Sequence, residues 1–181
     1  IFESILWIQA VEVIPTKIEI CSPVVYHSYN TNYGGPLRKG EVIKSGGSFQ
    51  FLASALINPC YRLYAEIRLN PRTNGVMSER TRTWQSKTTS PEHAYQEMFN
   101  RRLKRGQCFS IPFLGWKEFA PDYVGIFRQT TQVMRDINLR IPSMLRQVFP
   151  NGLNSELQYV YDNNVDITEG VLTFKDVSNV E

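Results

Sequence analysis

The sequence has few cysteines and no long hydrophobic run, and each of these absences excludes a class of protein. Cys21, Cys60 and Cys108 are an odd number and show no CxxC or Cys/His spacing. This favours reduced, partly buried thiols over a disulfide framework or a zinc site. No apolar run approaches the roughly 20 residues of a membrane-spanning helix, and no signal peptide opens the chain. We therefore expect a cytoplasmic protein without a membrane partner.

Motifs of the common enzyme classes are absent as well. The chain contains no P-loop, dinucleotide fingerprint, HExxH or GxSxG motif, so it gives no support to the chemistry that these motifs carry. It has only two histidines, His27 and His93. We expect neither a cofactor nor a metal. Hydrophobic residues make up 42% of the 181 residues, which excludes a disordered chain and is enough for a real core.

The net charge of +3 hides an uneven distribution of charge along the chain. Residues 61–105 carry ten Lys and Arg against four Asp and Glu, a local charge of +6. Residues 151–181 carry one Lys against six acids, a local charge of −5. Either a solvated charged face or a surface for nucleic acid or phosphate explains the cationic segment.

The segment from Ser90 to Gly106 shows a clear helix pattern. Ser90 stands at the N-cap, Pro91 at the first helical position and Gly106 where helices commonly stop. Apolar residues recur at three- and four-residue spacing on one face: Ala94, Tyr95, Met98, Phe99 and Leu103. Cations crowd the last turn: Arg101, Arg102, Lys104 and Arg105. Part of this charge complements the helix dipole, and the excess predicts a polyanionic ligand.

Two strands are predicted from alternating side chains. Val11–Cys21 alternates in part, and Pro15 makes it an edge strand or puts a bulge in it. Tyr61–Leu69 alternates along its full length, so one face belongs to the core and the other to solvent. Between them lies a polar, glycine-rich tract, residues 22–58, which is typical of a hairpin or loop inserted between strands.

This insertion interleaves tyrosines with cations. The cations that we single out are Arg38, Lys39 and Lys44. Such a composition suits RNA, because cations bind phosphates while rings stack on unpaired bases, although an ordinary exposed loop explains it equally well. A second long loop, residues 72–89, is expected to contain Arg82, Lys87 and an exposed Trp84.

The remaining elements are predicted from weaker patterns. Ile1–Ile8 fits one helical face without an N-cap, so the sequence is expected to start inside a helix whose beginning is missing. Residues 107–119 indicate a short buried strand, ended by Pro121. Beyond it we expect strands at 123–127, 130–133, 157–161 and 165–174, and a helical turn or irregular segment at 142–149. The strands of the acidic end, with breaks near residues 163–164 and 169–170, are expected to form a small antiparallel sheet.

The predicted order of helix, strand, long insertion, strand, helix and strand is that of a βαββαβ ferredoxin-like fold whose first strand is missing from this chain. In these elements the chain resembles the CRISPR-associated Cas five family, d variant, of subtype I-C systems. The resemblance covers most of the chain and rests on Phe2–Trp7, Tyr61–Leu69, Met98–Arg102 and above all Gly106–Phe119. Residues 141–146 and 170–172 also look like one branch of that family.

The resemblance implies an α+β chain with a ferredoxin-like (RRM-like) RNA-binding domain at residues 1–121 and a small β extension at residues 122–181. It implies binding of CRISPR repeat RNA and metal-independent cutting of the precursor transcript. The protein would then stay on the 5′ handle beside other Cascade subunits. The expected RNA-binding residues are Arg38, Lys39, Lys44, Arg82, Lys87, Arg101, Arg102, Lys104 and Arg105.

Cutting without a metal requires the ribose 2′-OH to attack the adjacent phosphate, which leaves a 2′,3′-cyclic phosphate and a 5′-OH. A base must remove the 2′ proton, an acid must protonate the leaving oxygen, and cations must neutralise the crowded phosphate. His93 and Tyr95 are the catalytic candidates. A first-turn surface histidine and a core tyrosine are the competing interpretations of these two residues.

Three positions differ from the family pattern. Leu6 stands where characterised relatives have a tyrosine, and Ala94-Tyr95 stands where they have a Lys-His pair. Because leucine and alanine cannot transfer a proton, they favour a second hypothesis, a catalytically silent structural subunit that caps the 5′ handle. A third hypothesis is an unrelated RRM-like module, and the Gly106–Phe119 block argues against it.

Overall fold

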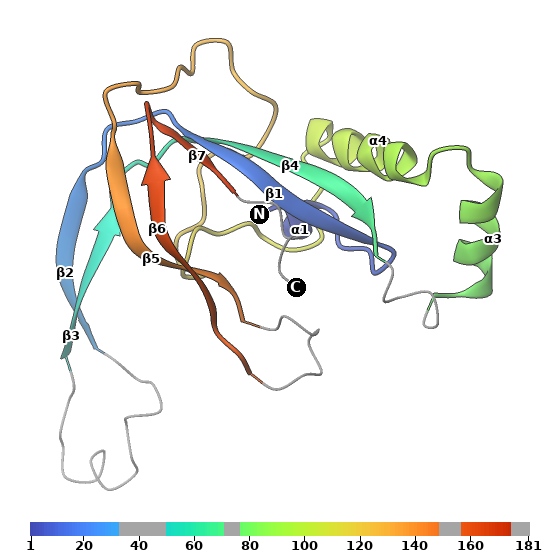
Figure 1. Ribbon diagram of the computed structural model, residues 1–181, viewed down its shortest axis with the longest axis horizontal. Helices are drawn as coiled ribbons and strands as arrows, with labels where there is room; N and C mark the ends of the chain where they lie inside the picture. Colours follow the sequence, from blue (N-terminus) through green and yellow to red (C-terminus); the bar gives the residue numbers. More distant parts are fainter. Residues whose placement is uncertain (33–49, 71–76, 149–156, 175–181) are drawn as a thin grey trace, which may run out of the picture. The chain divides into compact units, whose positions relative to one another are not determined.

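The computed structural model describes residues 1–32, 50–70, 77–148 and 157–174. The chain folds as two compact units: the first comprises Ile1–Ile18, Arg62–Gln132 and Val171–Glu181, and the second Glu19–Tyr61 and Val133–Gly170. Antiparallel sheets with few helices make it an α+β protein, as predicted, consistent with a ferredoxin-like domain plus a small β domain (Figure 1). The domain boundary after residue 121 stays a prediction.

The first unit is built on a three-stranded sheet with the order β4-β1-β7. Its strands are β1 at Val11–Ile20, β4 at Tyr61–Leu69 and β7 at Val171–Thr173, and Figure 1 shows β1 and β4 side by side. The two strands predicted from alternation are thus confirmed. Of the two predictions for Pro15, the edge strand is wrong, because β1 lies between β4 and β7, and the bulge stays a prediction. The short β7 arrives from much later in the sequence to pair with β1, and a pairing so distant leaves no local signal.

Both faces of β4 are partly covered, which differs from the predicted division into a core face and a solvent face. Phe127 packs edge-on against Tyr64 with ring centroids 5.1 Å apart. The ammonium of Lys17 lies 3.9 Å from the centre of the same Tyr64 ring. Arg62 donates a hydrogen bond to the backbone oxygen of Thr131. The face expected in solvent is therefore covered by cation–π and hydrogen-bond contacts.

The described helices of the first unit are α1 at Phe2–Ile5, α3 at Glu79–Lys87 and α4 at Pro91–Lys104. α1 is a single turn, shorter than predicted, because the backbone is already extended at Leu6 (φ −135°, ψ 106°). The prediction of α4 is confirmed, and Gly106 just beyond it has a positive φ of 63°. Ser90 is the N-cap of α4, but its side chain makes no capping hydrogen bond.

α3 lies where the sequence predicted a long loop, so that prediction is wrong for residues 79–87. The helix starts at a cap: the hydroxyl of Ser78 accepts a hydrogen bond from the backbone N–H of Thr81 at 3.3 Å, and Glu79 places a carboxylate in the first turn. Polar residues dominate α3, so it offers little apolar periodicity to detect. Residues 72–76 of the predicted loop lie outside the described residues.

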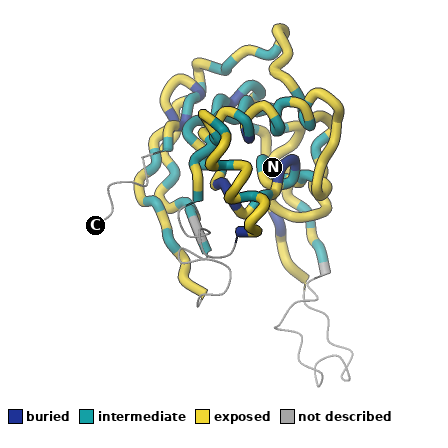
Figure 2. The backbone as a smooth tube through the Cα atoms, turned by 90° about the vertical axis from the view of Figure 1, so that its right-hand side faces the viewer, coloured by how far each residue is buried: buried dark blue, intermediate teal, exposed yellow. Residues whose placement is uncertain are grey.

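The core of the first unit joins α4 to the sheet. Tyr95 of α4 packs with Val11 of β1 and with Met77, while Ile67 of β4 lies against the same cluster. Figure 2 shows that fully buried stretches of backbone are short. Many large aromatic side chains of this unit therefore remain on the surface, where they are available to a partner.

Turns, and no strand, occupy residues 107–132, all of which the structure describes. The strands predicted at 107–119, 123–127 and 130–133 are therefore wrong. Phe109 is 62% exposed and Ile111 76% exposed. The apolar composition that indicated a buried strand lies on the surface instead, because composition alone does not supply a neighbouring strand.

The second unit consists of two antiparallel hairpins. In the first hairpin, β2 at Tyr26–Asn32 pairs with β3 at Gln50–Leu56. Of the two predictions for the insertion, a hairpin or a loop, the hairpin is confirmed. Residues 33–49, which include Arg38, Lys39 and Lys44, lie outside the described residues.

In the second hairpin, β5 at Leu139–Gln147 pairs with β6 at Val160–Ile167. The antiparallel sheet predicted for the acidic end is confirmed for β6, although its partner β5 precedes that end and β7 pairs with β1 instead. The helical turn or irregular segment predicted at 142–149 is wrong, because β5 occupies most of it. Pro142 lies within β5, where a two-stranded ribbon leaves free edges that tolerate a residue without an N–H.

The end of β6 shows one correct and one wrong prediction of a break. β6 continues through Asn163 and Asn164, where a break was expected. The break at Glu169-Gly170 is confirmed, since both residues have positive φ, 49° and 73°. A Cβ at Gly170 would collide with the backbone oxygen of Met134, so only glycine fits there.

Candidate nucleic-acid interface

The end of α4 divides its four cations between two sides of the helix. Arg101, Lys104 and Arg105 are exposed and recur at i, i+3 and i+4, so they share one face. Arg102 is half-buried, and its Nη1 donates a hydrogen bond to the backbone oxygen of Ile5 at 2.9 Å. Three of the predicted cations therefore face solvent, while the fourth fastens α1 to α4.

α1 also fixes the start of the segment that follows α4. The backbone N–H groups of Phe109 and Ser110 both donate to the backbone oxygen of Ser4, at 2.7 and 3.0 Å. The rings of Phe2 and Phe99 pack with centroids 6.0 Å apart. α1, the end of α4 and the residues that follow the helix are thus held together as one piece.

An aromatic pair stands at this junction. The ring of Trp7 stacks on the ring of Phe109, with centroids 5.4 Å apart and planes 24° from parallel. Trp7 is 48% exposed and Phe109 62% exposed. Phe109 follows Arg105 by four residues, at most about 14 Å of extended chain, so the stack lies near the end of α4. We define the α4 end surface as Arg101, Lys104, Arg105, Trp7 and Phe109.

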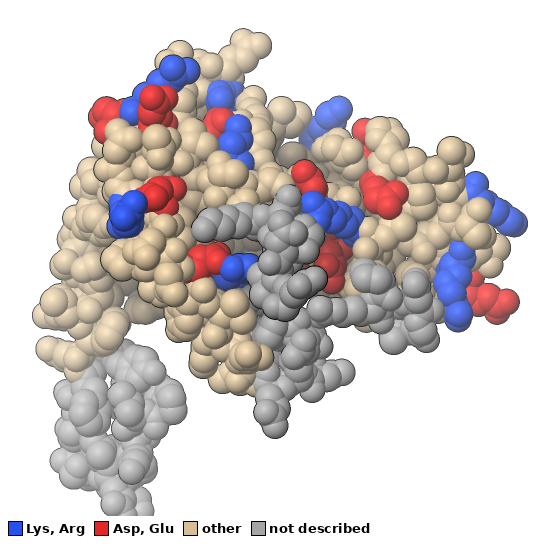
Figure 3. All heavy atoms as spheres, in the orientation of Figure 1, with Lys and Arg blue, Asp and Glu red and all other residues tan. Residues whose placement is uncertain are grey.

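The α4 end surface carries positive charge without a carboxylate partner. Within the described ranges, no Asp or Glu forms an ion pair with Arg101, Lys104 or Arg105. Figure 3 shows basic side chains over the end of α4 and around α3, with carboxylates between the two groups. Exposed cations beside exposed rings are the arrangement with which proteins bind single-stranded nucleic acid: cations track the backbone and rings stack on bases.

The two predicted catalytic residues lie on opposite sides of α4. His93 and Tyr95 are two positions apart, which is about 200° around a helix. His93 is exposed, whereas Tyr95 is 3% exposed and packs edge-on against Trp84 at 5.3 Å between centroids. Burial raises the pKa of the Tyr95 phenol above its usual value of 10.0. Tyr95 is thus a core residue here, and a catalytic role for the two residues stays a prediction.

His93 shares a side of α4 with part of the α4 end surface. It precedes Lys104 by eleven residues, which is about 20° of rotation and about 16 Å along the helix axis. Two of the positions that differ from the family pattern hold no ionisable group: Leu6 is 2% exposed, and Ala94 is half-buried on the apolar side of α4. An exposed His93 is therefore the better placed of the two catalytic candidates.

The remaining predicted RNA-binding residues divide into two groups. Arg82 and Lys87 are exposed on α3. Arg38, Lys39 and Lys44 lie outside the described residues. His27 lies on β2, exposed, with its ring 6.2 Å from that of Tyr29 in a stacked arrangement.

Sequence reasoning missed Trp7 and Phe109 as surface residues. Trp7 was expected within a longer helix, and Phe109 in a buried strand. The available signal is Gly106 followed by Pro112: a glycine turn and a residue without an N–H bracket Phe109, and both argue against a regular buried strand.

Other site chemistries have little to build on in the described part of the chain. There, no group of three or more His, Cys, Asp or Glu side chains is arranged to hold a metal ion. None of the helices in the same residues has the length and apolar character needed to cross a membrane. Cys21 and Cys60 are half-buried as expected, whereas Cys108 is exposed.

Comparison with known proteins gives a likeness of fold. No family model matches the sequence, and no curated protein does either. A solved structure described as a CRISPR-associated protein superposes with a TM-score of 0.61 at 15% identity, covering 99% of this chain and 77% of that one. A functionally uncharacterized protein from Streptococcus mutans gives a TM-score of 0.61 at 14% identity, covering 100% of this chain and 79% of that one. At these identities the likeness shows a shared fold alone.

Proposed function

We propose that this chain binds CRISPR repeat RNA through the α4 end surface and holds the 5′ handle as a cytoplasmic subunit of a Cascade complex. The observation that carries the proposal is that the exposed Trp7–Phe109 stack lies near the end of α4, where three cations face solvent. The fold likeness to a CRISPR-associated protein supports the CRISPR context. Together they favour a single-stranded RNA segment as the ligand.

The chemistry of the surface fits an unpaired RNA segment better than a duplex. Arg101, Lys104 and Arg105 lie on one side of α4 and meet successive phosphates of one strand. Trp7 and Phe109 offer ring area to bases, which are available for stacking only where they are not already stacked in a helix. The 5′ handle of a processed repeat RNA is a segment of this kind.

The test is a titration of fluorescently labelled repeat RNA with the full chain at salt concentrations from about 50 to about 200 mM. Three phosphate contacts predict that log K falls against log salt with a slope of about −2 for a single strand. A Trp7→Leu variant keeps every charge, so it should weaken binding at each salt concentration and leave that slope unchanged. An affinity that does not vary with salt would contradict the proposal.

Metal-independent cutting of the precursor RNA is a second candidate function. It is favoured by the exposed His93, which lies on the same side of α4 as Lys104. In this mechanism His93 acts as base or acid for the attack of the 2′-OH, with Tyr95 as the other partner, and nearby cations neutralise the phosphate. The buried phenol must then become accessible before it can take part.

Incubation of the chain with repeat RNA in EDTA tests this second function. Products with a 2′,3′-cyclic phosphate and a 5′-OH would support it, and a His93→Ala/Tyr95→Phe double variant should then leave the RNA intact. Cutting that persists in the double variant removes both residues from the mechanism. RNA that is bound but never cut supports the silent structural subunit that caps the 5′ handle.

A further inference from the structure

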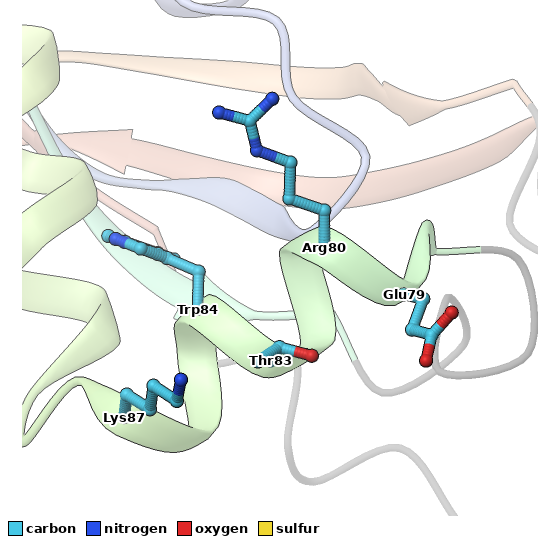
Figure 4. Close-up of a pocket in the computed structure, with 5 residues that line it drawn as sticks. All are labelled: Glu79, Arg80, Thr83, Trp84 and Lys87. Carbon is cyan, nitrogen blue, oxygen red and sulfur yellow. The ribbon is translucent and has the colours of Figure 1, made fainter.

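α3 carries a second surface on which an exposed tryptophan stands among cations. Arg80, Trp84 and Lys87 recur at i, i+4 and i+7, so they lie within about 60° of one another around the helix. With Glu79 and Thr83 they line an open hollow of about 470 Å³. Figure 4 shows Arg80, Trp84 and Lys87 following one another along α3, with Glu79 directed away from them.

The ring of Trp84 is held by a neighbouring ring and is also partly exposed. It packs against Tyr95 of α4 in a T-shaped arrangement, with centroids 5.3 Å apart and planes at 67°. The backbone oxygen of Trp84 accepts a hydrogen bond from the Thr88 hydroxyl at 2.8 Å. The side chain is nevertheless 40% exposed. A large ring that is both fixed and accessible binds a flat ligand with little loss of conformational entropy.

The cations on this side of α3 have no carboxylate partner in the described ranges. Arg80 and Lys87 are seven residues apart, about 10 Å along the helix axis, and Trp84 lies between them. A base that stacks on Trp84 therefore has a cation on each side for the phosphates of its own strand. Arg82 lies about 200° around the helix from Arg80 and does not belong to this group.

We propose that Trp84 stacks on an unpaired base of a single-stranded RNA while Arg80 and Lys87 bind the flanking phosphates. This inference rests on the proposed RNA-binding function and adds a contact separate from the α4 end surface. It brings in Arg80 and Trp84, which sequence reasoning had not assigned to binding, and it leaves out Arg82. Because every base has a π-face, the contact selects unpaired RNA rather than a particular base.

The first experiment follows the fluorescence of Trp84 alone. The chain contains Trp7, Trp84 and Trp116. A Trp7→Phe/Trp116→Phe variant leaves Trp84 as the single emitter and keeps aromatic rings at the other two positions. Titration with an unlabelled single-stranded RNA should quench most of the emission, because a stacked base quenches indole fluorescence. Emission that does not change while the same RNA is bound, as followed by anisotropy of a labelled strand, would overturn the proposal.

The second experiment separates stacking from charge. Trp84→Leu should weaken binding of single-stranded RNA about 5- to 100-fold without changing the salt slope, whereas Trp84→Phe should retain much of the affinity. Arg80→Gln and Lys87→Gln should each reduce the slope by about 0.7. Arg82→Gln removes an equal charge from the other side of α3 and should reduce the slope less than Arg80→Gln or Lys87→Gln, because Arg82 lies outside this contact.

The outcomes distinguish this inference from the function on which it rests. Wild-type protein that shows no salt-dependent RNA binding contradicts the proposed function itself. Wild-type protein that binds RNA, with Arg80→Gln and Lys87→Gln indistinguishable from Arg82→Gln and a folded Trp84→Leu that binds as tightly as the wild type, contradicts the α3 contact alone. Circular dichroism shows whether Trp84→Leu is folded; if it is not, Arg80→Gln and Lys87→Gln decide, since both side chains are exposed.

Discussion

The cations at the end of α4 and those of the β5–β6 hairpin differ in whether the fold gives each a carboxylate. Arg140 of β5 donates from Nε and Nη2 to Asp166 on β6, at 2.6 and 3.1 Å. Arg146 binds Asp162 with the same two-pronged geometry. At the end of α4, by contrast, no described carboxylate pairs with Arg101, Lys104 or Arg105.

This difference shows that the net charge of a segment is a weaker guide to function than whether its charged side chains are paired. Arg140 and Asp166 lie directly opposite each other in the β5–β6 register, so cross-strand geometry neutralises both. A helix end offers no such opposite neighbour. The acidic end of the chain therefore uses two of its carboxylates on the arginines of its own hairpin, and the cations of α4 stay available to an outside anion.

Removing the cations at the end of α4 is the strongest test of whether unpaired cations bind RNA. Arg101→Gln/Lys104→Gln/Arg105→Gln should lower the affinity for single-stranded repeat RNA about 100-fold at low salt and remove about 2 units of salt slope. The measurement is anisotropy of a labelled RNA across salt. Arg140→Gln is the control, because that arginine already has a carboxylate partner. Equal losses in both variants would mean that pairing does not decide which cations bind RNA.

The free energy of unfolding should depend on the paired arginines and not on the exposed cations of α4, the reverse of what is expected for RNA binding. Arg146→Gln removes one partner of a pair whose side chains are 25% and 21% exposed and leaves the Asp162 carboxylate half-buried without its guanidinium. We expect a loss of about 1–2 kcal/mol in the free energy of unfolding, measured by urea denaturation. Arg105→Gln removes an equal charge from an exposed helix end and should leave the urea midpoint within error. A midpoint shift of the same size in both variants would contradict the comparison.

The fold was predictable where a local pattern is complete and unpredictable where a distant partner decides. α4 has a start residue, an apolar face and a stop, and β4 alternates throughout. β7 is three residues long and becomes a strand only because it pairs with β1 from the other end of the chain. The segment after Gly106 has the apolar composition of a strand but no strand beside it.

The candidate site shows the same limit at the level of side chains. The crowding of cations at the end of α4 is plain in the sequence. The sequence does not show that Arg102 is directed away from the other three cations, because its hydrogen-bond acceptor is the backbone oxygen of Ile5, 97 positions away. The opposite sides taken by His93 and Tyr95 follow from helical periodicity and were available from sequence. The stack of Trp7 on Phe109 depends on the turn that follows α1, so it could not be predicted from the sequence.

A smaller effect should follow when a paired cation is released. Asp166→Asn removes the carboxylate that binds Arg140 in an exposed pair. If pairing is what keeps Arg140 from an anion, affinity for RNA should rise about 2- to 3-fold and the salt slope should steepen by up to about 0.7. Asp136→Asn removes the same charge from an exposed position outside that pair and is the matched control. A rise of equal size in both variants would assign the effect to net charge rather than to Arg140.

The smallest expected effect is on the pH dependence of stability and comes from Tyr95. This residue lies on α4, like the exposed cations, but its uncharged phenol is buried. Burial raises the pKa of its phenol in the folded chain, so the folded state holds this proton more tightly than the unfolded state does. Stability from this group is complete below the unfolded pKa of about 10 and is lost as pH rises through the folded pKa. Tyr95→Phe should therefore leave the urea midpoint little changed at pH 7 and flatten its fall above about pH 10. Tyr61, whose pKa is raised by burial and by the neighbouring Tyr26, should give a similar flattening as Tyr61→Phe. If the urea midpoint of Tyr95→Phe falls above pH 10 as steeply as that of the wild type, the phenol has the same pKa in the folded and unfolded chain. Burial would then not raise the pKa of Tyr95.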